Sequence, residues 1–272
     1  MTLTSYPSDL TDAAWKVLRP ALLGLIPRYR GRVVSLRRVC DALAYRLRTG
    51  VQWRYLPHDF PGWGNVYRYY RAWTAAGVLH QVNDLIVRAS RAADPTCEAP
   101  EPTACVLDAQ AVKSGTRGRR DDRGFAGDKR VNGVKRHVAT DTGGRVLACV
   151  VSAANRHDGP YAREVLAHVR AGGYAGVRVA FADAGYRGQE RACAREATEL
   201  RVVTRGEVAA ERRRRKRLTG KAFAPLPKRW VIERTFGILS QWRALRVSHE
   251  RRSDHAESAY LLANAFSLLN RF

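Results

Sequence analysis

The sequence predicts an α/β protein in which a mixed sheet flanked by helices follows a small all-helical domain. Apolar residues recur at helical spacing in the first part of the chain, short strand-like runs begin at residue 104, and two long helical patterns end it. With 272 residues, the chain also exceeds a typical single domain of roughly 100 to 200 residues. We therefore expect a helical domain at 1–92, a linker at 93–103 and the sheet-containing domain at 104–272.

Four helices are expected in the first domain. Their apolar positions follow helical spacing in the segments Leu10 to Leu23, Val33 to Leu47, from about Asn65, and Val78 to Ala92. Ser35 can cap the second helix, and Gly50 can end it. Residues 53–63 contain two prolines and a glycine, so we expect a turn-rich connection there.

Helices joined by a short turn and carrying basic and aromatic side chains resemble a helix-turn-helix DNA-reading module. We expect phosphate contacts from four arginines of this domain, namely Arg37, Arg38, Arg68 and Arg71. Tyr67, Tyr70 and Trp73 follow one another at i, i+3 and i+6, so they share one helical face. For these three aromatic rings, core packing is the favoured alternative to DNA contact.

The strand-like runs of the second domain are separated by turn signals and one helical pattern. Strands are expected over Ala104 to Leu107, His137 to Thr140, Val146 to Val151, and Val177 to Ala182. Asp141-Thr-Gly-Gly predicts a hairpin between the second and third strands, because glycine adopts positive φ readily. A helix over Pro160 to His168 precedes the fourth strand, and this order indicates a mixed sheet.

Two long helices are expected to close the chain, over Arg229 to Leu245 and over Asp254 to Asn270. The second begins with Asp254 and Glu257 at the spacing of a capping box, in which side chains bind backbone N–H groups of the helix start. Before both helices lie six consecutive cations, which repel one another in a compact element and so predict a loop or arm. We expect all six to contact a phosphate backbone: Arg212, Arg213, Arg214, Arg215, Lys216 and Arg217.

The net charge is the strongest compositional signal. The 48 Lys and Arg residues against 25 Asp and Glu give +23, which predicts a polyanionic partner. Nucleic acid and an anionic membrane surface both fit this charge. No apolar run approaches the roughly 20 residues of a membrane span, and no secretory signal begins the chain, so we expect a soluble, cytoplasmic protein without membrane contact. Five cysteines without a C-x-x-C pair argue against a disulfide framework or structural zinc.

Three acidic residues stand where they could bind metal ions. Asp108 and Asp183 each follow a strand-like run, so both are expected at strand ends. A carboxylate buried there is costly unless a cation compensates its charge. Glu233 lies off the apolar stripe of its helix, and carboxylates from two strands and a helix can bind two Mg²⁺ ions. Taken singly, each Asp also fits a turn or helix cap, and Glu233 could pair with Arg229.

The histidines give a weaker signal. His137, His157 and Asp158 show no metal-ligand spacing, so we expect hydrogen-bonded or loop residues at these positions. An approach of the histidines to a phosphate stays an alternative.

Six motifs follow one another along the second domain: Leu107-Asp108-Ala-Gln-Ala-Val-Lys113, Gly127-Asp-Lys-Arg-Val-Asn-Gly133-Val-Lys135-Arg-His137, Asp141-Thr-Gly-Gly, Ala154-Asn-Arg-His-Asp158, Ala182-Asp183-Ala-Gly-Tyr186 and Arg229-x-x-x-Glu233-Arg-x-Phe. Further motifs in the first domain are Leu10-Thr-Asp-x-x-Trp15 and Arg48-Thr-Gly-Val-Gln-Trp53. In this order, the motifs resemble those of the bacterial DDE insertion-sequence transposases of the insertion-sequence-five group, over nearly the whole chain.

The resemblance implies a ribonuclease-H-like catalytic domain, a helix-turn-helix-like front domain and a carboxylate triad at Asp108, Asp183 and Glu233. It also implies two Mg²⁺ (or Mn²⁺) ions, double-stranded DNA as element terminal repeats and as target, and a homodimer assembled on DNA ends. Three further cations are then expected to contact phosphates near the triad: Lys113, Lys135 and Arg229.

The function implied by the resemblance is that of a DNA transposase, which cleaves element ends and transfers the strands into target DNA. In the wider group, a Tyr-x₂-Arg-x₃-Glu-x₆-Lys signature surrounds the glutamate. Arg229 and Glu233 match it, whereas Leu226 and Ser240 occupy the Tyr and Lys positions. Two alternatives stay open: a plain metal-dependent nuclease, and a catalytically inactive DNA-binding protein derived from a transposase.

Overall fold

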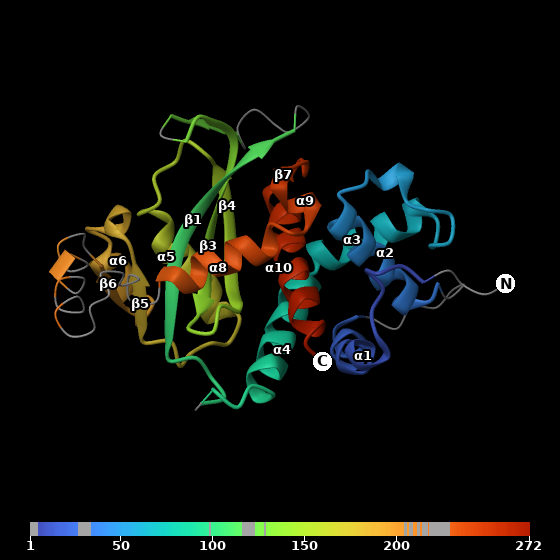
Figure 1. Ribbon diagram of the computed structural model, residues 1–272, viewed down its shortest axis with the longest axis horizontal. Coiled ribbons are helices and arrows are strands. Elements are labelled where there is room, and N and C mark those ends of the chain that lie inside the picture. Colours follow the sequence, from blue (N-terminus) through green and yellow to red (C-terminus); the bar gives the residue numbers. More distant parts are fainter. Residues whose placement is uncertain are drawn as a thin grey trace.

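The computed structural model describes residues 5–26, 34–97, 99–115, 123–127, 129–203, 206, 209, 210, 213, 217 and 229–272. The N-terminal helices lie at one side of the molecule and the sheet at the other, with α4 (Val78–Ala92) and α10 (Ser253–Leu269) between them (Figure 1). Nowhere in the described ranges does a helix have the length and apolar character needed to cross a membrane. All five cysteines lie in these ranges, and none forms a disulfide.

The N-terminal helices begin and end close to where the sequence predicts. They are α1 (Asp12–Leu25), α2 (Leu36–Thr49), the short 3₁₀ helix η1 (Trp53–Tyr55), α3 (Trp63–Ala75) and α4. Ser35 caps α2 by accepting a hydrogen bond from the Arg38 backbone N–H, and Gly50 ends it in the left-handed conformation at φ 73°. Both capping predictions are confirmed.

Core packing accounts for the aromatic residues of α3. Tyr70 and Trp73 are buried, and the Tyr67 and Tyr70 rings lie 5.0 and 5.4 Å from the Trp53 ring, centroid to centroid. The Tyr70 hydroxyl donates to the His255 carbonyl of α10 at 2.5 Å. A buried ring whose hydroxyl has an acceptor stabilises the contact between α3 and α10. The packing alternative is therefore confirmed for Tyr70 and Trp73.

A mixed sheet forms the second half of the molecule. Its strands are β1 (Ala104–Ser114), β2 (Gly124–Ala126), β3 (Val131–Asp141), β4 (Val146–Ala153), β5 (Val179–Ala182), β6 (Glu199–Val202) and β7 (Val247–Ser248). β3 pairs antiparallel with β1 and β4, while β5 pairs parallel with both β1 and β6. Short β2 and β7 extend the pairing of β3 and β1. Three antiparallel strands followed by two parallel ones confirm the expected ribonuclease-H-like sheet.

Helices cover both faces of this sheet (Figure 1). α5 (Tyr161–Ala171) packs on one face, where the His137 ring of β3 stacks on Tyr161 with centroids 4.2 Å apart. The preceding residue, Arg136, donates to the Leu245 carbonyl and lies over the Tyr260 ring of α10. Because neighbouring strand residues point to opposite faces, α5 and α10 cover opposite sides of β3.

The single helix expected over 229–245 is instead two helices, α8 (Arg229–Leu239) and α9 (Arg243–Arg246). The Ser240 hydroxyl donates to the Gly237 carbonyl at 2.7 Å, and the Trp242 indole N–H donates to the Ser267 hydroxyl of α10, also at 2.7 Å. Trp242 then stacks on Phe266. The prediction of one continuous helix is wrong, because burying Trp242 against α10 turns the chain.

One continuous apolar core joins the N-terminal helices to the sheet. α10 packs against both α4 and β4. Its Asn264 donates to the Asn83 side chain of α4 at 2.7 Å, and Asn83 donates to the Val146 carbonyl of β4 at 3.0 Å. The helical part and the sheet thus share buried polar bonds as well as apolar contacts. The division into folding units at 1–92, 93–103 and 104–272 stays a prediction.

A buried ionic network ties the end of α4 to the β3–β4 hairpin. The Asp141 carboxylate lies 2.6 Å from Arg91 of α4 and 3.2 Å from Arg145, which also contacts Asp94. The Asp141 and Arg145 side chains are 0% and 2% exposed. Buried charges are tolerated only when they are paired and hydrogen-bonded, and this network provides both. The hairpin predicted after Asp141 is confirmed.

Glu257 does not form the predicted capping box. α10 begins at Ser253, and its N-cap residue Arg252 contributes no side-chain cap. The Glu257 carboxylate instead accepts a hydrogen bond from the Val151 backbone N–H of β4 at 2.8 Å. That N–H lies on the edge of β4 that faces away from β3, and a buried backbone donor needs an acceptor. Burial raises the pKa of Glu257 from 4.5 to about 7.

Replacing Glu257 with Gln is expected to remove a pH dependence of stability. The folded chain keeps a proton on Glu257 up to about pH 7, whereas the unfolded chain releases it near pH 4.5. This group therefore stabilises the fold fully below pH 4.5, and the contribution is lost as pH rises towards 7. Relative to Glu257→Gln, the natural chain should lose up to about 1.4 kcal/mol of unfolding free energy per pH unit in this window. Urea unfolding at several pH values measures the difference, and parallel profiles would contradict it.

Candidate active site

Asp108 and Asp183 lie at matching positions of two neighbouring parallel strands. β1 and β5 pair in parallel, with Val106 registered to Phe181. Two residues further along both strands, the same register leads to Asp108 and Asp183. Neighbouring strands lie about 4.8 Å apart, and registered residues project to the same face. Strand pairing alone thus directs the two carboxylates to one place.

Asp108 lies inside β1, so the prediction that the strand ends at Leu107 is wrong. Pairing with β3 continues as far as Lys113, because the long β3 offers a partner to every residue of this stretch. Pairing with β5 ends at Val106, and pairing with β7 begins only at Lys113. Asp108 sits in the interval between these two neighbours, which accounts for its partial exposure.

Hydrogen bonds from adjacent backbone groups orient both aspartates. Asp108 Oδ1 accepts from the Ala109 N–H at 2.8 Å, and Asp183 Oδ1 accepts from the Gly185 N–H at 2.9 Å. The second bond caps the 3₁₀ helix η3 (Ala184–Tyr186), so the turn-forming alternative is confirmed for Asp183. A carboxylate has two oxygens with several acceptor positions, so capping a turn is compatible with binding a cation.

Asp158 joins the two aspartates, which the sequence did not predict. A Cβ built on Gly185 would lie 3.0 Å from Asp183 Oδ1 and 3.9 Å from Asp158 Oδ2. Tyr186 is buried beside them, and burial followed by the charges of Asp158, Asp108 and Asp183 raises its pKa well above 10. The three carboxylates thus lie near one buried phenol, and Asp158 and Asp183 both lie beside Gly185. A contact between residues that are far apart in the chain leaves no local signal in the sequence.

Asp108 projects to the sheet face that α8 and α10 cover. Its cross-strand partner on β3 is Val138, and registered residues of antiparallel strands share a face. Val138 is two residues beyond Arg136, whose side chain contacts α10. α8 packs against both β1 and α10 and so lies on this face too.

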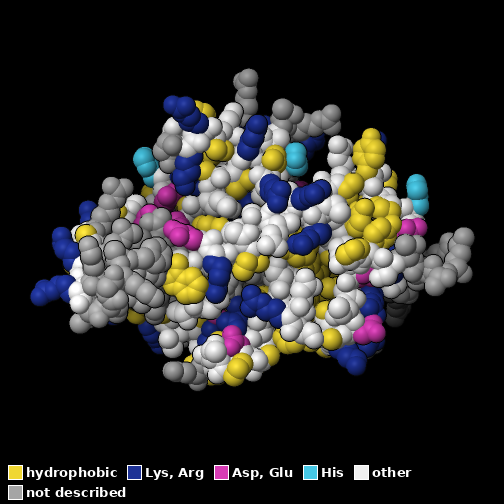
Figure 2. Space-filling view, in the orientation of Figure 1, with side chains coloured by type: hydrophobic (Ala, Val, Ile, Leu, Met, Phe, Trp, Pro, Cys, Tyr) yellow, Lys and Arg dark blue, Asp and Glu magenta, His cyan; other side chains and the backbone are white. Residues whose placement is uncertain are grey.

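Glu233 lies on the flank of α8 that faces away from the β3–β4 hairpin. Ile232 is buried against the sheet, and Thr235 donates to the Gly144 carbonyl of the β3–β4 hairpin at 2.7 Å. That hairpin lies beside the start of β1. With 3.6 residues per turn, Glu233 stands on the flank opposite Thr235. Figure 2 shows acidic side chains gathered beside the first turns of α8, with Lys and Arg side chains around α9 on the same face.

The predicted DNA-contacting arginines of α2 are engaged within the protein. Arg37 lies 2.6 Å from Asp12, and Arg38 lies 3.3 Å from both Asp9 and Asp41. Arg38 also lies over the Phe60 ring. These contacts hold the two guanidinium groups in the helical part of the molecule.

The predicted DNA contacts of α3 are exposed. Arg68 donates to the Asn65 side chain at 3.1 Å, and Arg71 lies over the Tyr67 ring. Both side chains remain accessible from solvent. They therefore offer cationic surface on the same helix.

Lys113 and Lys135 belong to strands, but by strand alternation they emerge on the α5 face and not on that of Asp108. Lys113 is exposed, and Lys135 lies 2.8 Å from Asp158. His137 shares their face, donates to or accepts from the Ser152 hydroxyl at 2.8 Å, and is buried, which lowers its pKa to about 4. His137 is therefore a hydrogen-bonded residue, as predicted, and is neutral at pH 7.

The run of six cations is described at two positions. Arg213 and Arg217 are exposed and have helical backbone, so of the two expected forms, a loop or an arm, the loop is not seen at these positions. The high helix propensity of arginine is compatible with this backbone. The other predicted contacts lie outside the described residues: Arg212, Arg214, Arg215, Lys216 and the side chain of Arg229.

The donor chemistry of the acidic site fits a divalent cation. Asp108, Asp183 and Glu233 offer carboxylate oxygens, which Mg²⁺ and Mn²⁺ prefer. The strand register supplies a pair of ligands, and α8 presents a third carboxylate on the same face. Within the described ranges, no three His, Cys, Asp or Glu side chains already stand close enough together to hold a metal ion.

Two family models match the chain. The model described as Transposase DDE domain matches residues 99–268, which is more than half of the sequence. The chain belongs to the DDE transposase family. A second model, described as a putative transposase of the IS4/5 family, matches residues 10–83, and together the matches identify an IS4/5-type DDE transposase.

A relative supports the same assignment for this DDE transposase. It is described as an insertion element IS402 uncharacterized 16.2 kDa protein from Burkholderia cepacia, and it is 34% identical over 91 residues. The alignment covers 31% of the present chain and 62% of the relative, so the chain spans less than two thirds of that protein's length. No solved structure matches the chain.

The two matched ranges correspond to different elements of the DDE transposase. Residues 99–268 contain the sheet with Asp108, Asp183 and Glu233, whereas residues 10–83 contain α1 to α3. Membership of this family implies DNA binding, DNA processing and the use of divalent metal ions in general terms.

Proposed function

We propose that this transposase cleaves the ends of a mobile DNA element and transfers the strands into target DNA by phosphoryl transfer at Asp108, Asp183 and Glu233. The shared register of β1 and β5 supports the proposal most, because it directs two carboxylates to one place. Glu233 is the proposed third member, from α8, which packs against β1. The net charge of +23 fits a DNA substrate.

The carboxylates would hold two Mg²⁺ or Mn²⁺ ions, which supply activation of the attacking hydroxyl and stabilisation of the leaving oxygen. The contribution of the chain itself is positioning. Asp108 is fixed by the β1–β3 ladder, and the cap on η3 orients Asp183. A phosphodiester transition state needs alignment and charge neutralisation more than covalent help from the protein. Rigid strands therefore suit this reaction better than loops.

Double-stranded DNA is the proposed partner, first as the terminal repeats of the element and then as target. Arg68 and Arg71 on α3 are exposed cations of the helical part that could contact the repeats. Arg213, Arg217 and Lys113 are further exposed cations. Two element ends must be cut and joined together, so we expect a homodimer when the protein is assembled on DNA.

Strand cleavage and strand transfer should be measured with the natural chain and a DNA duplex that carries an element end. In Mg²⁺ or Mn²⁺, we expect a nick at the end of the element, followed by products in which the new 3′ end is joined to a target plasmid. A chelator such as EDTA should stop both steps while end binding persists. Cleavage without joined products at any target concentration would identify a plain nuclease. Binding without cleavage at any metal concentration would identify an inactive DNA-binding protein.

A further inference from the structure

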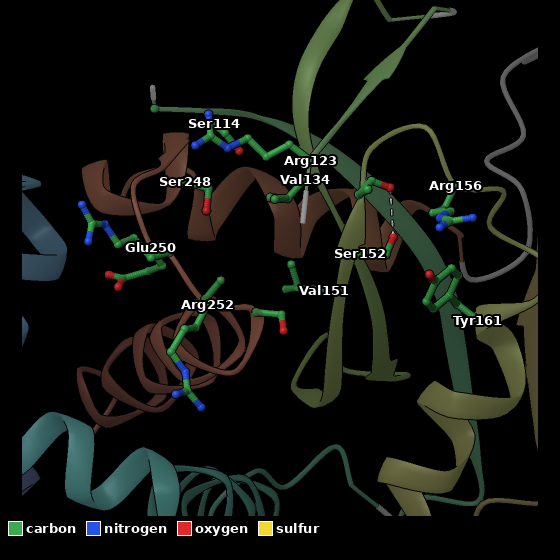
Figure 3. Close-up of a pocket in the computed structure, with 15 residues that line it drawn as sticks. Ser114, Arg123, Val134, Val151, Ser152, Arg156, Tyr161, Ser248, Glu250 and Arg252 are labelled. Atoms are coloured by element: carbon green, nitrogen blue, oxygen red, sulfur yellow. Dashed lines mark hydrogen bonds between the residues drawn. The ribbon is translucent and has the colours of Figure 1, made fainter. Parts of the chain in front are cut away.

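A polar cavity of about 210 Å³ lies at the far end of β1, and its lining includes Ser114 and Val134 from the sheet face of Asp108 and Tyr161 from the opposite face, which α5 covers. It is enclosed by Ser114 of β1, by Val134 and Val151 of the neighbouring strands, and by the segment that leads from β7 into α10 (Figure 3). Ser114 and Asp108 lie an even number of residues apart on β1, so their side chains project to the same face of the sheet. A single water needs roughly 10 to 15 Å³, so the cavity has room for a much larger group.

Positive charge dominates the lining of this cavity. Arg123, Arg156 and Arg251 come from three separate segments, and within the described part of the chain none forms a side-chain hydrogen bond or ion pair. The Arg123 Nε is fully buried without an acceptor. The acidic residue of the lining, Glu250, is neutralised by Arg46 at 2.8 Å. Three arginines that form no side-chain hydrogen bond or ion pair within the described part of the chain thus line one cavity.

The start of α10 adds to the positive electrostatic potential of the cavity. Ser253 and Ala256 of its first turn line the cavity, and the N-cap residue Arg252 contributes no side-chain cap. Backbone N–H groups and the helix dipole at such a terminus favour an anion. Guanidinium groups from several directions match the several oxygens of a phosphate group, each of which can accept hydrogen bonds.

We propose that this cavity binds one backbone phosphate of the element end, at a distance from the phosphate that is cleaved. The proposal rests on the proposed function for its DNA substrate. Ser114 follows Asp108 by six residues on β1, which places the cavity about 20 Å along the strand. Phosphates of one DNA strand advance by about 3.4 Å per base pair along the helix axis, so for a duplex that runs along β1 the bound phosphate lies about six base pairs from the cut.

The experiment combines protein variants with single neutral phosphates. Arg156 and Arg251 are exposed, so the double variant Arg156→Ala with Arg251→Ala should fold normally. Arg195→Ala is the matched control, since Arg195 is exposed at the end of α6 (Glu190–Ala194) and its side chain forms no hydrogen bond or ion pair with another described residue. Affinity for an end duplex is measured with a methylphosphonate placed at each backbone position in turn.

We expect the double variant to bind the natural duplex about tenfold more weakly, and the slope of log affinity against log salt to shrink by about one. One methylphosphonate, about six base pairs from the cut, should weaken the natural chain and Arg195→Ala but should not weaken the double variant further. Equal sensitivity of all three proteins at every position would overturn the proposal. So would competition by millimolar inorganic phosphate without any sensitive position, because the cavity would then serve a free anion.

This binding experiment does not depend on cleavage. A chain that never cuts DNA but shows the coupled phosphate position would lose the proposed function and keep the cavity as a DNA contact. A chain that cuts and joins DNA without a coupled position would keep its function and lose the cavity.

Discussion

Replacing Asp108 with Asn, or Asp183 with Asn, is expected to lower the rate of strand cleavage by on the order of 10³-fold or more. Asn has nearly the shape of Asp, and its side-chain oxygen can still accept the hydrogen bonds from Ala109 and Gly185. The substitution removes the negative charge that a divalent cation needs. Stability and affinity for element ends should therefore change little, while cleavage in Mg²⁺ is lost.

Single-turnover cleavage of an end duplex measures this effect, and a binding assay with the same duplex accompanies it. Glu199→Gln on β6 is a suitable control, because this exposed carboxylate pairs with Arg201 away from the acidic site. Cleavage at the natural rate by either aspartate variant would remove that residue from the proposed triad.

The third ligand can be tested in the same assay. Glu233→Gln should reduce cleavage as strongly as the aspartate variants, whereas Asp158→Asn should have a much smaller effect because Asp158 is paired with Lys135. The reverse order would replace Glu233 by Asp158 in the triad. This comparison is necessary because Asp158 and Asp183 both lie beside Gly185, where an added Cβ atom would be within 4 Å of a carboxylate oxygen of each.

Replacing Asp141 with Ala is expected to destabilise the fold by about 3 to 5 kcal/mol. The change leaves the buried Arg91 without a carboxylate partner and Arg145 with Asp94 alone, and it removes the acceptor for the Gly143 and Arg145 backbone N–H groups. An uncompensated buried charge costs far more than the loss of a surface ion pair. The free energy of unfolding should therefore fall for the protein in the absence of DNA.

Urea unfolding monitored by tryptophan fluorescence measures this loss. Arg163→Ala provides the control, because the Arg163 side chain is half exposed and its pairing with Glu196 lies on the surface. A loss for Asp141→Ala no larger than for Arg163→Ala would show that the network does not stabilise the fold.

Local patterns in the sequence were sufficient for much of the fold. Ser35 and Gly50 act on their own backbone neighbours, and the Asp141 turn is set by the two glycines that follow it, so each could be predicted from a short segment. The extent of β1 could not, because Gln110 and Lys113 interrupt its apolar run and pairing with the distant β3 decides where it ends. The role of Glu257 was missed for the same reason, since its partner is an N–H of β4.

The candidate site shows the same division. The residues themselves indicated three carboxylates, but their assembly followed only from the resemblance to a family. The register of β1 and β5 then gave a physical reason for Asp108 and Asp183 to meet. Asp158 and Arg156 belong to a motif that carries the resemblance, but no place at the acidic site or the cavity was predicted for them, because those contacts join segments that are remote in the chain.

α10 is buried between α4 and the sheet, and Asn264, Asn83 and Val146 join the three by hydrogen bonds. The helical part, to which we assign the contacts with the terminal repeats, and the strand that carries Asp108 thus share one apolar core. The distance from the recognised base pairs to the cut is then expected to be set by the protein. Inserting base pairs between them should abolish cutting at the element boundary, while the protein stays bound at the same base pairs.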